Sequence, residues 1–80
     1  CCGLTPAGMT AYDLADAAIK RAIIASAHRI IAAAEPAKFS RTALAYVTPV
    51  SALSMVVTTD DADDEHTNAL TAAGTIVHKV

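Results

Sequence analysis

Residues 13–40 of this 80-residue chain read DLADAAIKRAIIASAHRIIAAAEPAKFS and decide the fold. They predict a helix, then a buried strand, then a loop that carries a lysine. Apolar residues recur at the three-to-four spacing of one helix face, while Asp13, Asp16 and Lys20 share the opposite face. We therefore expect one face of the helix to pack against the rest of the protein and the other to contact water or a ligand.

The ends of the helix are indicated by capping signals. Thr10 and Asp13 fit a capping box, so we expect the helix to begin at Ala11. His28 and Arg29 suit the negative end of the helix dipole, and we expect the helix to end near them.

The strand is predicted from the apolar run at residues 30–34, which Pro36 ends. The run does not alternate, which is typical of a strand covered on both faces in a parallel sheet. Alanine is a poor strand former, so a buried helical turn is the competing interpretation.

The rest of the chain continues the alternation of strands and helices. The segments are a strand end and glycine loop at 1–8, a short helix or turn within 41–53, a strand at 54–59, a helix that begins in the acidic run 60–65 and ends at Gly74, and a final strand at 75–80. This order predicts the α/β class: a partial three-layer sandwich with a mainly parallel sheet and covering helices.

Composition limits the possible roles. The chain is 54% hydrophobic and 18% charged, which is more apolar surface than a free monomer of this length can bury. We therefore expect the C-terminal half of a single domain, with apolar surface facing missing chain or another subunit. A net charge of -2 gives no basic surface for nucleic acid, and no apolar run is long enough to span a membrane.

The positions of the cysteines and histidines do not indicate a metal site or a disulfide framework. Two adjacent cysteines have neither a disulfide framework nor a metal-site spacing, which favours a reducing, cytoplasmic location. The three histidines share no metal-binding spacing, so no metal or cofactor is expected.

Three segments should meet where the strands end and the helices begin: residues 3–13, 35–40 and 59–63. The third is acidic and would repel a phosphate, so an anionic ligand is expected near the first two, with Lys38 as its contact. A surface lysine is more often a solvated charge, and this interpretation stays open.

The strings GLTPAGMTAYDLADAAIKRAIIASAHRIIAAAEPAKFSR, SMVVTTD and ALTAAGTIVHKV resemble the C-terminal half of the effector domain of DeoR-type bacterial transcriptional regulators. Several residues fall on that family's motifs: Gly8, Met9 and Thr10 on its glycine-loop step, Asp16, Lys20 and Arg21 on its Glu-Ala-x-x-Lys-Arg helix, Lys38 and Phe39 on its Lys-Phe loop, and Thr59 and Asp60 on its Thr-Asp strand end. Asp16, Glu35 and Ser40 depart from the usual glutamate, aspartate and glycine.

The resemblance implies a fold related to ribose-5-phosphate isomerase and CoA transferases, and a homo-oligomeric repressor that senses a phosphorylated sugar or related metabolite. DNA would be bound by an N-terminal winged helix-turn-helix that is absent here. The implied ligand-binding residues are Thr10, Asp16, Lys20 and Lys38.

Two alternatives remain open. A fragment of a sugar-phosphate isomerase is one, although isomerases of this fold carry a catalytic glutamate directly before the helix lysine, where this chain has Ile19. Without that base the proton transfer has no agent, which favours a sensor over an enzyme. A pure assembly module is the second alternative.

Lys20 also has a structural explanation, an ion pair with Asp16 worth about 0.3–0.5 kcal/mol.

Overall fold

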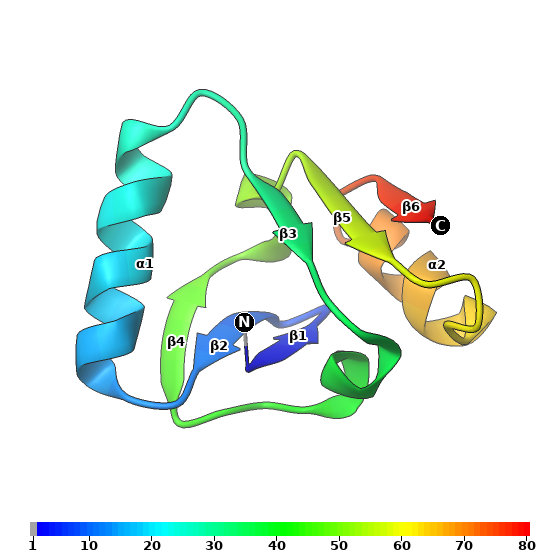
Figure 1. Cartoon of the computed structure of the whole chain (residues 1–80), viewed down its shortest axis with the longest axis horizontal. Helices are drawn as coiled ribbons and strands as arrows, with labels where there is room; N and C mark the ends of the chain where they lie inside the picture. Colours follow the sequence, from blue (N-terminus) through cyan, green and yellow to red (C-terminus); the bar gives the residue numbers. More distant parts are fainter. Residues whose placement is uncertain (1) are drawn as a thin grey trace.

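The computed structural model describes residues 2–80, which form two three-stranded sheets, two α-helices and two short 3-10 helices (Figure 1). In chain order the elements are β1 (Gly3–Thr5), β2 (Gly8–Ala11), α1 (Leu14–Ser26), β3 (Ile31–Ala33), η1 (Pro36–Ser40), β4 (Ala45–Thr48), η2 (Val50–Ala52), β5 (Met55–Thr58), α2 (Asp64–Ala72) and β6 (Val77–Lys79). None of the described helices is both long and apolar enough to cross a bilayer.

The parallel sheet has the order β3-β5-β6, and α2 connects its last two strands. It confirms the α/β class and the three strands predicted at residues 30–34, 54–59 and 75–80. Within β3, however, only Ala32 is buried, whereas Ile31 and Ala33 are exposed. The expectation that both faces of this strand are covered is therefore wrong for the described residues.

The antiparallel sheet has the order β1-β2-β4 and was not predicted. The end of a loop and the start of a helix were expected where β2 lies, and a short helix or turn where β4 lies; both expectations are wrong. Gly8 turns the chain into β2 with a φ of 136°, and a Cβ there would lie 2.7 Å from the Thr48 carbonyl oxygen. Tyr46, Val47 and Thr48 are residues that fit a pleated, half-buried strand.

Helix α1 begins three residues later than predicted. Its N-cap is Asp13, whose Oδ1 accepts a hydrogen bond of 2.7 Å from the amide of Asp16. Thr10 cannot cap the helix because it lies inside β2. The helix ends at Ser26 with Ala27 as its C-cap, so His28 lies beyond it.

Helix α2 agrees with its prediction. Asp63 caps it by accepting from the amide of Glu65, acids occupy its first turn, and Gly74 follows its C-cap with a φ of 113°. The carboxylates of the acidic run therefore stabilise the positive, N-terminal end of the helix dipole.

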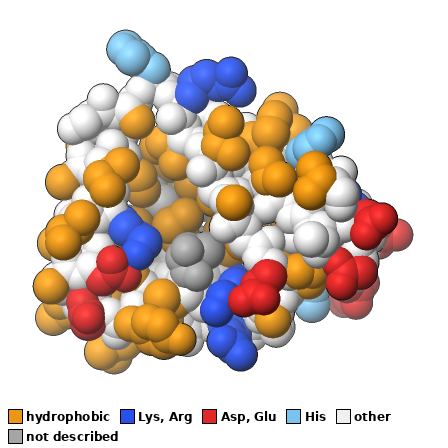
Figure 2. All heavy atoms as spheres, in the orientation of Figure 1, with side chains coloured by type: hydrophobic (Ala, Val, Ile, Leu, Met, Phe, Trp, Pro, Cys, Tyr) orange, Lys and Arg blue, Asp and Glu red, His pale blue; other side chains and the backbone are white. Residues whose placement is uncertain are grey.

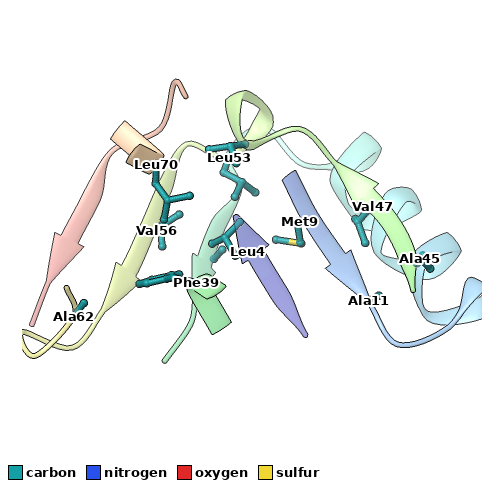
Figure 3. Close-up of a cluster of buried hydrophobic side chains, with 13 residues drawn as sticks. Leu4, Met9, Ala11, Phe39, Ala45, Val47, Leu53, Val56, Ala62 and Leu70 are labelled. Carbon is teal, nitrogen blue, oxygen red and sulfur yellow. The ribbon is translucent and has the colours of Figure 1, made fainter. Parts of the chain in front are cut away.

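The core joins the two sheets. Leu4 of β1, Phe39 of η1, Val56 of β5 and Leu70 of α2 belong to one buried cluster together with Leu53 (Figure 3). Much apolar surface nevertheless stays outside: the exposed large apolar residues are Tyr12, Leu14, Ile19, Ile23, Ile31, Leu44, Tyr46, Ile76 and Val80.

Candidate functional site

The carboxyl ends of β3, β5 and β6 lie at one edge of the parallel sheet, which is where α/β folds bind ligands. An open hollow of about 350 Å³ occupies this edge. Its lining residues come from the ends of the three strands: Ala33, Ala34, Glu35, Val57, Thr58, Thr59 and Val80. We call it the strand-end hollow. Its volume is within the range of roughly 300–1,000 Å³ of small-molecule sites.

Lys38 lies beside the strand-end hollow. Its Nζ is 3.6 Å from Oε1 of Glu35, a wall residue of the hollow. That separation is too long for a hydrogen bond, and no hydrogen bond from the Lys38 ammonium occurs within residues 2–80. The side chain is 20% exposed, and the adjacent Phe39 is buried in the core and anchors η1. Lys38 and Glu35 therefore form a salt bridge beside the hollow, in which the Lys38 ammonium makes no hydrogen bond within the described residues.

Thr10 is buried in β2, and its hydroxyl makes two hydrogen bonds within the protein. The Oγ1 atom accepts a hydrogen bond of 2.8 Å from the amide of Ala43 and donates one of 3.4 Å to the carbonyl oxygen of Gly3. These bonds tie β2 to β1 and to the chain before β4. The hydroxyl has a structural role, and its burial leaves no path to a ligand.

Asp16 and Lys20 form a salt bridge of 2.6 Å on α1, as their spacing predicts. Helix α1 packs against β2 and β4, whereas η1 packs against β1. Figure 1 shows α1 and η1 on opposite sides of the β1-β2-β4 sheet. The structure therefore does not bring the four predicted site residues together: Lys38 lies beside the strand-end hollow, Thr10 inside the sheet, and the Asp16–Lys20 pair on the far helix.

The acidic end of the molecule is organised by Lys79. Its ammonium donates to Oδ1 of Asp64 over 2.6 Å and to the carbonyl oxygen of Ala62 over 3.0 Å. The hydrogen bond and charge of Lys79 lower the pKa of the Asp64 carboxyl below its ordinary value. The motif residue Thr59 donates to the carboxylate of Asp61. Within the described part of the chain no cluster of three or more possible metal ligands occurs.

Sequence reasoning placed Glu35 at the strand ends, at the start of segment 35–40, but did not name it as a ligand-binding residue. In the structure it lies two residues after the end of β3, at the edge where the parallel strands end.

The family model of the DeoR C terminal sensor domain matches residues 1–60 of the 80. Comparisons with curated proteins and with solved structures find no significant match.

Proposed function

The chain belongs to the family of DeoR C-terminal sensor domains, which are effector-binding parts of transcription regulators, and from this premise we propose that it binds a phosphorylated sugar or related metabolite in the strand-end hollow. In this proposal Lys38 contacts the phosphate. The effector then controls DNA binding by a repressor whose helix-turn-helix lies outside residues 1–80 and which acts as a cytoplasmic homo-oligomer.

The proposal rests on the surroundings of the Lys38 ammonium. It has a carboxylate neighbour at 3.6 Å but no hydrogen-bond acceptor within residues 2–80, and most of its side chain is covered. A phosphate oxygen at this position would gain a charge-assisted hydrogen bond in a partly desolvated place. The Glu35 carboxylate beside it accepts hydrogen bonds only, so it suits the hydroxyl groups of a sugar.

The remaining predicted residues take no part in this pocket. Asp16 and Lys20 already neutralise each other on α1, and the buried Thr10 hydroxyl uses its only donor on the carbonyl oxygen of Gly3. Signalling requires that the effector prefer one arrangement of the regulator, since a ligand with equal affinity for two states shifts neither.

The test is effector binding by a Lys38→Met variant, which keeps the aliphatic stem and removes the charge. Affinities for ribose 5-phosphate, ribose and inorganic phosphate are measured by calorimetry. A lost charged hydrogen bond is worth about 1.5–3 kcal/mol, so the variant should bind ribose 5-phosphate roughly 10- to 150-fold more weakly.

Lys20→Met is the matched control because it makes the same change of charge on α1. It should leave the affinity unchanged. Equal affinity in native protein and Lys38→Met, or an equal loss in both variants, would refute the assignment of Lys38. Turnover of ribose 5-phosphate by the native protein would decide for an isomerase instead.

A further inference from the structure

Carboxylates surround the strand-end hollow. Glu35 lines it with a side chain that is 68% exposed, so its carboxylate can contact a molecule in the hollow. Thr59, another lining residue, donates its hydroxyl to the carboxylate of Asp61, which holds a second negative charge near the rim. Figure 2 shows further acidic side chains at the α2 end of the same face. A ligand in the hollow would therefore lie close to at least two carboxylates.

Positive charge is scarce at this edge. All six lysines and arginines of the chain lie within residues 2–80, so each of them can be located. Lys20 and Arg21 belong to α1. Arg29 precedes β3 and therefore lies at the amino end of that strand, whereas the hollow lies at the carboxyl end. Arg41 lines a separate concavity. Four of the six cations are thus placed away from the wall of the hollow.

The two remaining cations already have negative neighbours. Lys79 donates hydrogen bonds to the Asp64 carboxylate and to the carbonyl oxygen of Ala62, so its charge is balanced. Lys38 lies beside the hollow with Glu35 at 3.6 Å, and the pair carries no net charge. At this edge the described residues therefore offer one ammonium that makes no hydrogen bond, and that ammonium is Lys38.

We propose that the strand-end hollow selects effectors with one phosphate over effectors with two, and that Glu35 determines this selectivity; the inference rests on the function proposed above. A first phosphate gains charge-assisted hydrogen bonds from Lys38. A second phosphate on the same sugar finds no further ammonium and lies near the Glu35 carboxylate, because the hollow measures only about 350 Å³. Like charges a few ångströms apart repel each other, and a protein surface weakens this repulsion less than bulk water does.

The test compares two ligands that differ by one phosphate group, ribose 5-phosphate and ribose 1,5-bisphosphate. Their affinities are measured by calorimetry, and the native protein should bind ribose 5-phosphate at least about tenfold more tightly. Glu35→Gln keeps the size of the side chain and removes its charge, so it should reduce this ratio to about threefold or less. Because Glu35 is exposed, the substitution should leave the fold intact.

Glu65→Gln is the matched control. Glu65 is an exposed glutamate in the first turn of α2 and is not among the residues that line the hollow, so its replacement should leave the ratio unchanged.

Two results would overturn the inference while ribose 5-phosphate still binds and the proposed function stands. One is a native protein that binds the bisphosphate as tightly as the monophosphate, or more tightly. The other is a ratio that Glu35→Gln leaves unchanged, or that both variants reduce equally. If the native protein binds neither ligand, the proposed function fails and this inference fails with it.

Discussion

Replacement of Thr58 by valine should stabilise the protein. Thr58 is 3% exposed, and its Oγ1 is a buried oxygen without a hydrogen-bond partner within residues 2–80. Burial of such a hydroxyl costs about 1–3 kcal/mol, and the valine methyl that replaces it gains up to about 0.8 kcal/mol from burial. We expect Thr58→Val to raise the free energy of unfolding by about 1–2 kcal/mol, which corresponds to at least about 4 °C in Tm for a chain of this size.

Thr75→Val is the matched control. Thr75 is 5% exposed, but its Oγ1 donates a hydrogen bond of 2.9 Å to the carbonyl oxygen of Leu53. The same substitution there removes a satisfied hydrogen bond and should lower the free energy of unfolding by about 1 kcal/mol. Urea denaturation followed by circular dichroism measures both changes. If Thr58→Val destabilises as much as Thr75→Val, the Thr58 hydroxyl has a partner and the reasoning fails.

Three further predictions concern a cap, a glycine and an ion pair. Asp13→Ala should lower the Tm, because a lost N-cap costs about 0.5–2 kcal/mol, and helix content by circular dichroism checks it. Gly8→Ala should destabilise by at least about 1 kcal/mol in urea, because the new Cβ meets the Thr48 carbonyl oxygen at 2.7 Å with φ at 136°. Lys79→Met should raise the pKa of Asp64 toward its ordinary value in an NMR titration. The folded-state pKa of Asp64 is lowered. The stabilisation by this pair is therefore complete above the unfolded-state pKa near about 4, and it is lost as the pH falls through the folded-state pKa. The free energy of unfolding of the variant should lack this decrease at low pH.

The parallel sheet and α2 could be predicted because their signals are local. The β-branched segment at 54–59, the acids before α2 and Gly74 after it each determine structure within a few residues. Strands β2 and β4 could not be predicted in the same way. They are four residues each, and they are stabilised by pairing with each other across 33 to 38 intervening residues, which no local pattern records.

The error at the start of α1 has the same origin. Thr10 and Asp13 are both good capping residues, and the local sequence does not choose between them. Pairing of β2 with β4 extends through Ala11, which places Thr10 in a strand and leaves Asp13 as the cap. The pairing of two strands that are distant in the sequence therefore determines where α1 begins, and the capping signals alone placed that start three residues too early.

The candidate site shows which features of a binding site can be predicted from a sequence. The position of Lys38 after a parallel strand was sufficient to place it near the strand ends, because that relation follows from topology. Whether Lys20 joins it depends on how α1 is placed against the unpredicted antiparallel sheet, and Thr10 lies within that sheet. One missed pairing thus accounts for the division of the predicted site.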